Sequence, residues 1–207
     1  MITITNEDCM ELMGRYADGY FDLAVVDPPY GIGVDGQKKS TSKHGGRREK
    51  VFKGWDSQTP DKPYWNELFR VSKNQIVWGA NYFTSYLPPS MGWVFWDKGQ
   101  RIANSDGELA YTSFKRALRV VEINRVYITE HGDTMHPTQK PVALYKWLLH
   151  NYAKPGDRIL DTHLGSGSIA IACHDYGYDL TACELDPEYY AAAMKRIEAH
   201  RAQGRLF

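Results

Sequence analysis

The sequence predicts an α/β protein with a mostly parallel sheet and helices on both of its faces. Two observations lead to this prediction. Short apolar segments alternate with helical patterns along nearly the whole chain, and 43% of the 207 residues are hydrophobic, which is enough for the core of one ordinary domain. No internal repeat and no linker divides the chain, so residues 1–207 are expected to form a single domain.

Seven segments have the length and apolar content of β-strands, namely 2–5, 21–27, 75–79, 93–97, 109–114, 158–161 and 180–184. Between them, six segments have the apolar spacing of helices, namely 8–15, 62–71, 80–86, 141–152, 168–176 and 187–201. The last of these has Pro187 in its first turn, where proline is well tolerated. Two stretches fit neither pattern: the segment 33–54, rich in Gly, Lys, Arg and Ser, and the run 114–135.

The overall charge gives no indication of a nucleic-acid partner. The chain has 25 basic and 25 acidic residues, so its formal net charge is zero, and any electrostatic case depends on local patches. Three cysteines without metal or disulfide spacing fit a reducing cytoplasm. No apolar stretch approaches the length of a membrane span, and the N-terminus lacks signal-peptide features, so a soluble protein without a membrane partner is expected.

The segment VVDPPYG, residues 25–31, forms a rigid acidic corner after an apolar strand. Pro28 and Pro29 prevent the strand from continuing and prevent an immediate helix, so the chain must turn at Asp27. Neither proline has an N–H group, which leaves the nearby carbonyl groups available as acceptors. Tyr30 precedes a glycine that leaves the face of its ring open. The corner is therefore a binding site or a tight loop.

The segment 158–186 has the layout of a nucleotide-type site. A strand ends at Asp161, the small-residue loop 165–167 opens a helix, and the next strand ends at Glu184 about 20 residues later. The glycines admit a ligand close to the backbone, and Glu184 can accept hydrogen bonds from both ribose hydroxyls. The loop lacks the Lys-Ser/Thr pair of a P-loop and the third glycine of a dinucleotide site. A nucleoside without phosphates fits it better, and a plain strand-to-helix turn is the alternative.

Three motifs follow one another along the chain: DPPY at 27–30, HPTQKP at 136–141, and an acid with a GSG loop at 161 and 165–167. In this order they resemble the β group of amino-methylating, S-adenosylmethionine-dependent DNA methyltransferases, which carry the catalytic motif ahead of the cofactor motif. The resemblance covers nearly the whole chain. It implies a Rossmann-like, seven-stranded methyltransferase sheet with helices on both faces and a circularly permuted motif order.

For methyl transfer to an exocyclic amine, the resemblance assigns the catalytic site to Asp27, Pro28, Pro29 and Tyr30. The Asp27 carboxylate and the Pro28 carbonyl can accept the two amino protons, which aims the nitrogen lone pair at the methyl group. The ring of Tyr30 can stack on a base flipped out of the duplex, and such stacking is worth roughly 1–3 kcal/mol.

The resemblance also implies S-adenosylmethionine as the cofactor. It assigns close approach of the cofactor to the loop 165–167, its ribose to Glu184 and its adenine to Asp8. Lys140 is expected to neutralise the methionine carboxylate of the cofactor. The full set of expected cofactor contacts is Asp8, Asp27, Thr138, Lys140, Asp161, Gly165, Ser166, Gly167 and Glu184. Where the family usually has Pro-Phe after the acid, this chain has His163 and Leu164, a departure that bears on cofactor affinity.

Double-stranded DNA is the expected partner, and the basic loop 33–54 is its expected contact. Residues 35–54 carry seven basic and two acidic residues, a local excess of five positive charges. The expected DNA contacts are Lys38, Lys39, Lys43, Arg47, Arg48, Lys50 and Lys53, with Arg116 and Arg119 in the short segment 115–135. A solvated loop without DNA contact is the alternative for the first segment. Related enzymes are often dimers, so a homodimer is an expected assembly.

Together these features predict a site-specific DNA adenine-N6 methyltransferase. Aspartate at the first position of DPPY favours adenine, because cytosine-N4 enzymes of the group more often have serine there. Cytosine-N4 methylation is the first alternative, and methylation of RNA or of a protein glutamine amide is more distant. A catalytically idle DNA-binding module is the alternative from another class. No metal site is expected, because His131 and His136 have no cysteine or carboxylate that completes a ligand spacing.

Overall fold

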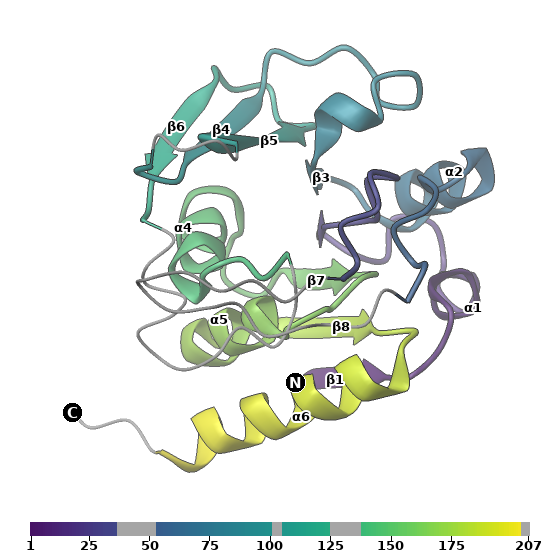
Figure 1. The fold of residues 1–207 in the computed structure, drawn as a ribbon, viewed down its shortest axis with the longest axis vertical. Helices are drawn as coiled ribbons and strands as arrows, with labels where there is room; N and C mark the ends of the chain where they lie inside the picture. The colour runs from purple at the N-terminus through teal and green to yellow at the C-terminus, as the bar shows by residue number, and fades with distance from the viewer. Residues whose placement is uncertain (37–52, 101–104, 125–137, 204–207) are drawn as a thin grey trace.

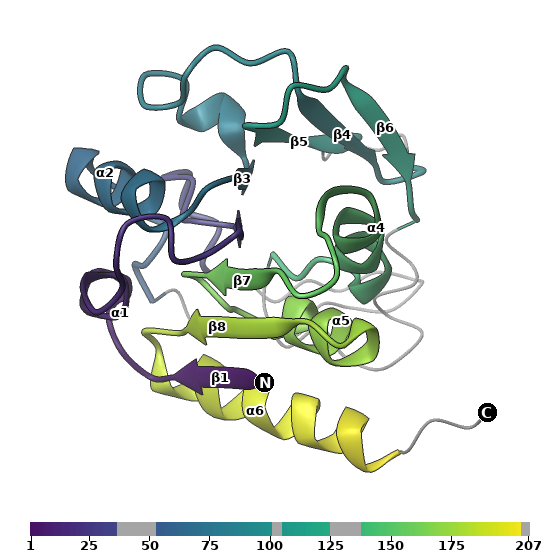
Figure 2. The same cartoon turned by 180° about the vertical axis from the view of Figure 1, so that it is seen from behind.

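The computed structural model describes residues 1–36, 53–100, 105–124 and 138–203. These residues form an eight-stranded sheet with the order β1-β8-β7-β2-β3-β5-β4-β6 (Figures 1 and 2). The strands are β1 Ile2–Thr5, β2 Leu23–Val26, β3 Gln75–Trp78, β4 Trp93–Asp97, β5 Gly107–Thr112, β6 Arg119–Glu122, β7 Arg158–Asp161 and β8 Asp179–Cys183. The helices are α1 Cys9–Gly14, α2 Lys62–Val71, α4 Val142–Tyr152, α5 Ser168–Tyr176 and α6 Pro187–Ala202, and a 3₁₀ turn, η1, covers Ala80–Tyr82.

The strand order confirms the predicted Rossmann-like fold and its permuted motif order. Neighbouring strands are parallel throughout, except that β5 runs antiparallel to both β3 and β4. The N-terminal strands β1 and β2 pair with the C-terminal strands β8 and β7, so the two ends of the chain build adjacent parts of one sheet. Between β2 and β7 the strand order reverses. In open α/β sheets, ligands bind at such a switch point.

The sheet has one strand more than the seven that the sequence predicts. β6 lies in the run 114–135, and of its four residues only Val121 is buried, so the segment shows no apolar alternation. The helix expected over 80–86 is the three-residue turn η1. It has no side-chain N-cap, and Pro88 and Pro89 follow closely, so a longer helix is not supported.

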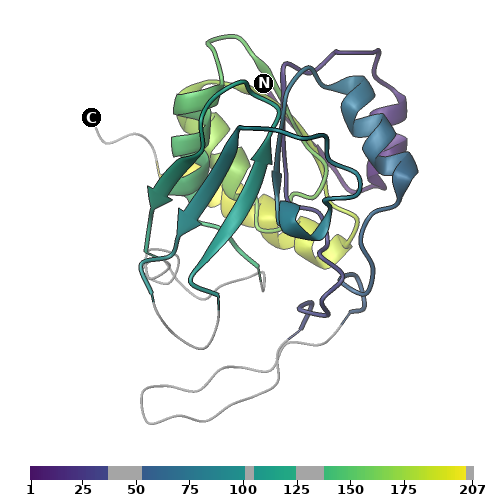
Figure 3. The ribbon, with the colours of Figure 1, turned by 90° about the horizontal axis from the view of Figure 1, so that it is seen from above.

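The helices cover both faces of the sheet, as Figure 3 shows from above. One core contains α1 and α2, and the other contains α4, α5 and α6. Strand β2 contributes to both, because Leu23 and Val25 face the second core while Ala24 and Val26 face the first. The end of β2 is therefore held from both sides. No helix in the described ranges is long and apolar enough to cross a lipid bilayer.

Candidate active site

The residues singled out by the motifs meet at one edge of the sheet. Strands β1, β2, β3, β4, β7 and β8 all end at this carboxyl edge, whereas the antiparallel strand β5 begins there. The loops after the strands and the first residues of β5 therefore lie together. The polar side chains that they bring to the edge are Asp8, Asp27, Lys98, Glu108, Asp161 and Glu184.

Asp27 is the centre of the acidic corner. The Tyr30 hydroxyl donates a hydrogen bond to its Oδ1 at 2.6 Å, and Lys140 Nζ donates to its Oδ2 at 2.5 Å. The side chain of Lys140 is only 1% exposed. Burial raises the pKa of Asp27, although the charge of Lys140 opposes this. Burial disfavours the ammonium of Lys140, but the neighbouring carboxylates outweigh it and raise the pKa of Lys140. The sequence placed Lys140 at the cofactor, and the structure places it against Asp27.

A second carboxylate, Glu108, belongs to the same cluster. Its Oε2 lies 3.1 Å from Lys140 Nζ, and its Oε1 lies 2.8 Å from Lys98 Nζ. Burial would raise the pKa of Glu108, but the charges of Lys140 and Lys98 overcome it and lower the pKa to about 2. The cluster therefore contains two carboxylates and two ammonium groups. Sequence reasoning missed Glu108, because its position depends on the reversed direction of β5, which no motif indicates.

The backbone of the corner is fixed by Asp56, which sequence reasoning also missed. Asp56 is 2% exposed. Its Oδ1 accepts the N–H groups of Tyr30 at 2.7 Å and Gly31 at 2.9 Å, and its Oδ2 accepts the N–H of Val34 at 2.8 Å. Because prolines leave this loop without its own hydrogen-bonded structure, one carboxylate determines its shape.

The ring of Tyr30 lies in an aromatic environment. It stacks on Tyr82 of η1 with centroids 5.2 Å apart and planes at 15°, and Phe83 approaches it edge-on. Gly79, with φ +65°, lies against the ring: a Cβ there would be 2.1 Å from Tyr30 Cε1. Only glycine therefore fits between β3 and Tyr30. Burial raises the pKa of the Tyr30 hydroxyl well above its ordinary value, so it remains a donor at neutral pH.

The carboxylate of Glu184 is oriented toward the loop 165–167. Its Oε2 accepts the Gly165 N–H at 2.8 Å, and its Oε1 accepts the Asp186 N–H at 3.0 Å. Each oxygen retains acceptor capacity after these bonds. Burial raises the pKa of Glu184. The arrangement suits a ligand that donates two neighbouring hydroxyl groups.

The loop itself is held by a residue of α6. Arg196 Nη1 donates to the Ser166 carbonyl at 2.8 Å and to Ser168 Oγ at 2.9 Å. Gly167 has φ +74°, and a Cβ there would lie 3.0 Å from Ile197. The glycine thus allows α5 to start close against α6, while no side chain covers the loop backbone from this position.

Asp161 is the last residue of β7, the strand that pairs with β2. Its side chain is buried, and its Oδ1 accepts the His163 N–H at 3.0 Å. Burial raises the pKa of Asp161 to about 8, and the charges of Asp27 and Glu184 add to this effect. Burial also lowers the pKa of His163 to about 4. Both side chains are therefore mainly uncharged at neutral pH.

Two further expected cofactor contacts lie at the same edge. Asp8 caps α1, where its Oδ1 accepts the Met10 N–H at 2.7 Å. Thr138 is half-buried and precedes Lys140 by two residues. The cofactor roles of these residues, like those of the other motif residues, stay predictions.

Among the expected DNA contacts, Lys53 is engaged within the chain. Its Nζ donates to Asp186 Oδ2 at 2.7 Å and to Glu188 Oε2 at 2.6 Å, and it lies 4.5 Å from the Tyr189 ring centroid. Its ammonium thus ties the end of the basic loop to the start of α6.

The remaining expected DNA contacts are distributed over two regions. Arg116 donates to the Asn151 carbonyl and lies over the ring of Tyr152, whereas Arg119 is exposed at the start of β6. The other predicted contacts, Lys38, Lys39, Lys43, Arg47, Arg48 and Lys50, lie outside the described residues. Contact with DNA stays a prediction for all of them.

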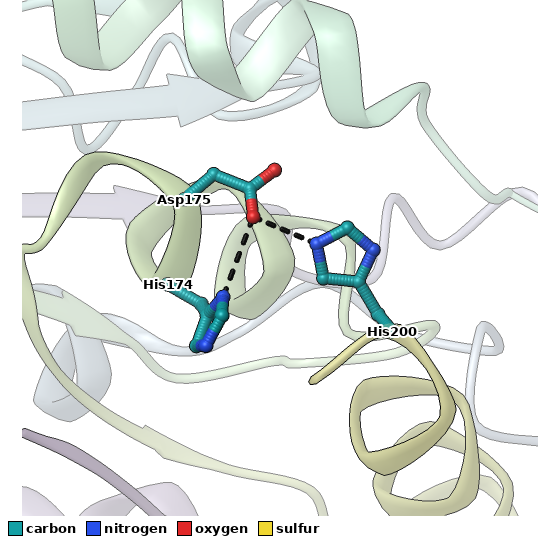
Figure 4. A group of neighbouring side chains, drawn as sticks. All are labelled: His174, Asp175 and His200. Atoms are coloured by element: carbon teal, nitrogen blue, oxygen red, sulfur yellow. Dashed lines mark hydrogen bonds and ion pairs between the residues drawn. The ribbon is translucent and has the colours of Figure 1, made fainter. Parts of the chain in front are cut away.

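One group of potential metal ligands lies away from this edge, at the last turns of α5 and α6 (Figure 4). Asp175 Oδ1 lies 2.7 Å from His200 Nε2 and 3.3 Å from His174 Nδ1. Its Oδ2 pairs with Lys146 of α4 at 2.7 Å. Burial works against the charge of Asp175, but these hydrogen bonds lower its pKa to about 2. Lys146 already supplies the positive charge, so the cluster is explained as a link between three helices.

A Rossmann-like sheet with an acidic DPPY corner beside a glycine loop defines the class of group-transferring enzymes that act with a nucleoside-type cofactor. Residues 70–195 match the family model of N6_N4_Mtase, described as DNA methylase. The chain is 30% identical to the type II methyltransferase M.HpaI of Haemophilus parainfluenzae, over 93% of this chain and 73% of that protein. The protein therefore belongs to the family of amino-methylating DNA methyltransferases.

Two solved structures show the same fold. The M1.HpyAVI complex with SAM has a TM-score of 0.64 at 19% identity and covers 95% of this chain and 100% of that one. The cytosine-N4-specific PvuII DNA methyltransferase has a TM-score of 0.63 at 11% identity and covers 98% and 92%. The same architecture thus occurs in a cytosine-N4-specific enzyme.

Proposed function

We propose that this protein is a site-specific adenine-N6 methyltransferase of double-stranded DNA, with S-adenosylmethionine as the methyl donor. The position of Asp27 carries the proposal. Its carboxylate follows β2 at the switch point, next to β7 and the loop 165–167, where the acceptor amine and the cofactor must meet. Aspartate rather than serine at the start of DPPY favours adenine over cytosine.

The chain offers the groups that such a cofactor requires. When bound, S-adenosylmethionine supplies an electrophilic methyl group on a sulfonium. Gly165 and Gly167 leave the loop backbone accessible, and the two oxygens of Glu184 are oriented to accept from ribose hydroxyls. Asp8 and Lys140 remain the candidates for the adenine and the methionine carboxylate.

The acidic corner would bind the target amine. The Asp27 carboxylate and the Pro28 carbonyl accept its two protons, so that the nitrogen lone pair points at the methyl group. In the transfer the amine gains the methyl group and a positive charge, and it then loses one proton, for which Asp27 is the carboxylate in reach. The Tyr30 ring supplies a stacking surface for the flipped base.

The proposal extends to the surroundings of the reaction. Residues 1–207 act as one catalytic domain, and the segments 33–54 and 115–135 contact the duplex. A homodimer would let a chain of this size cover more of the DNA. The enzyme would need no metal and would work in the cytoplasm.

The direct test is methylation of unmethylated duplex DNA with labelled S-adenosylmethionine, followed by digestion to nucleosides and identification of the methylated base by mass. Asp27→Ala should abolish the product. Asp18→Ala is the matched control, because the side chain of Asp18 is 84% exposed and lies before β2, at the opposite edge. N6-methyladenine that disappears only in the Asp27 variant is the expected result.

Other products would redirect the proposal in defined ways. N4-methylcytosine would keep the mechanism and overturn the base assignment. A protein that binds the cofactor, seen as a rise in its melting temperature, yet methylates no DNA would point to RNA or a protein amide. A protein that does not bind the cofactor would be an idle DNA-binding module.

A further inference from the structure

Glu108 and Asp27 share one ammonium group. Lys140 Nζ lies 2.5 Å from Asp27 Oδ2 and 3.1 Å from Glu108 Oε2. The other oxygen of Glu108 pairs with Lys98 at 2.8 Å. Glu108 is thus anchored through one oxygen, while its second oxygen faces the ion pair at the catalytic corner.

Both oxygens of Asp27 already accept a hydrogen bond in this structure. The Tyr30 hydroxyl donates to Oδ1, and Lys140 donates to Oδ2. An amine proton that binds either oxygen must share it with the present donor, so Asp27 becomes a stronger acceptor once that donor leaves. Lys140 is 1% exposed, and breaking a buried ion pair is strongly unfavourable when the remaining charge stays unpaired. Lys140 therefore needs another anion within reach before it can leave Asp27.

We propose that Glu108 is a positioning residue that takes over Lys140 when the target amine binds Asp27. This inference rests on the proposed function. Because Lys140 Nζ already lies within hydrogen-bonding distance of Glu108 Oε2, the exchange requires only the loss of the contact with Asp27. The ammonium stays paired throughout, and Asp27 becomes a free acceptor at the moment of transfer.

The geometry distinguishes this role from that of a simple structural ion pair. A pair between Lys98 and Glu108 alone would not place an oxygen 3.1 Å from the ammonium that holds Asp27. Glu108 Oε2 also lies 3.4 Å from the Tyr30 hydroxyl, the other donor to Asp27. Both donors on Asp27 therefore face the same second acceptor.

The test uses the double variant Lys98→Met/Glu108→Gln, which removes one charge of each sign. Of the two carboxylates that pair with Lys140 in the described residues, it leaves only Asp27. Because the cluster stays neutral, the fold should be retained, which thermal unfolding checks. The kcat for DNA methylation is expected to fall about 10- to 100-fold, the effect of losing a charge-assisted hydrogen bond. The KM for DNA and the Kd for S-adenosylmethionine should change less than about threefold, because the proposed exchange acts on the transfer step.

Adding Lys140→Met to the double variant separates positioning from structure, because the ammonium that competes with the amine is then absent. The measurement is made at saturating S-adenosylmethionine and at alkaline pH, because burial raises the pKa of Asp27 and Lys140 no longer opposes this. There the triple variant should recover at least about tenfold in kcat relative to the double variant. A structural role for Glu108 predicts the opposite, because a third substitution in the cluster would lower kcat further.

Glu122→Gln is the matched control, since Glu122 is exposed on β6, and it should leave kcat unchanged. If the double variant has the kcat of the wild type, the inference is overturned and the proposed function stands. The same holds if the double variant loses kcat and the triple variant does not recover it. If the wild type methylates no DNA, both fail. If the double variant does not fold, Glu108→Asp keeps the charge but withdraws the carboxylate. It should lower kcat about 3- to 10-fold, and an unchanged kcat would overturn the inference.

Discussion

Replacing Asp161 with asparagine tests whether the acid at the end of β7 carries a proton in the folded protein. Asp161 is 2% exposed, and burial raises its pKa from 3.8 to about 8. Between these two pH values the folded protein keeps a proton that the unfolded chain releases. The free energy of unfolding of the wild type should therefore fall as the pH rises through this window. Asparagine has no titrating group and retains an oxygen that can accept the His163 N–H.

The size of the effect follows from the pKa shift. Within the window, each pH unit lowers the stability of the wild type relative to Asp161→Asn by about 1.4 kcal/mol. From pH 5 to pH 8 the difference in free energy of unfolding between the two proteins should change by about 4 kcal/mol in favour of the variant. Urea unfolding of both proteins at both pH values measures it, and the other titrating groups, present in both, largely cancel. A difference that does not change with pH would refute the protonated Asp161, and a change of opposite sign would show a carboxylate that folding stabilises.

Three further predictions concern the backbone and the rings of the acidic corner. Gly79→Ala should lower stability and methylation because its Cβ would overlap the Tyr30 ring. In a Tyr30→Ala background, the loss in free energy of unfolding caused by Gly79→Ala should shrink to the backbone strain of about 1–2 kcal/mol, as measured by urea unfolding. An equal loss in both backgrounds would exclude a clash between the new Cβ and the Tyr30 ring. Asp56→Ala should reduce the free energy of unfolding by about 2 kcal/mol or more, because three backbone N–H groups lose their acceptor. Asp56→Asn, which keeps one acceptor oxygen, should cost less, and equal effects would contradict this account. Tyr82→Ala should raise the KM for DNA about 2- to 10-fold, because the stack that orients Tyr30 is worth about 0.5–1.5 kcal/mol, while Tyr82→Phe should leave the KM unchanged. A rise in the KM for DNA in Tyr82→Phe would instead assign the role to the hydroxyl of Tyr82.

The local signals in the sequence predicted most elements of the fold. Helices α2 and α5 have the predicted bounds because their ends are encoded nearby: Asp61 caps α2 ahead of a proline, and glycines with positive φ flank α5. Strand β6 was missed because three of its four residues are exposed. It is a strand only through its pairing with β4, which a local pattern does not contain.

The residues of the candidate site show the same difference between local and long-range signals. Asp27, Asp161 and Glu184 were predictable because each lies at the carboxyl end of a strand at or next to the switch point. Glu108 and Asp56 were not, because their roles come from partners distant in the sequence. Lys140 belongs to a recognised motif, yet its contact with Asp27 joins residues 113 positions apart. A motif identifies the residue, but only the folded sheet determines which group it meets.

The hairpin of β4 and β5 carries Lys98 and Glu108 into the site from one connected unit. The two strands are paired from Trp93 to Asp97, and the Lys98 N–H closes the hairpin on the Asp106 carbonyl at 3.0 Å. Both site residues are thus set by strand register, independently of the connecting residues 99–105. The hairpin is therefore a preassembled half of the charge cluster, and a single change in its strand register would displace both of its charges at once.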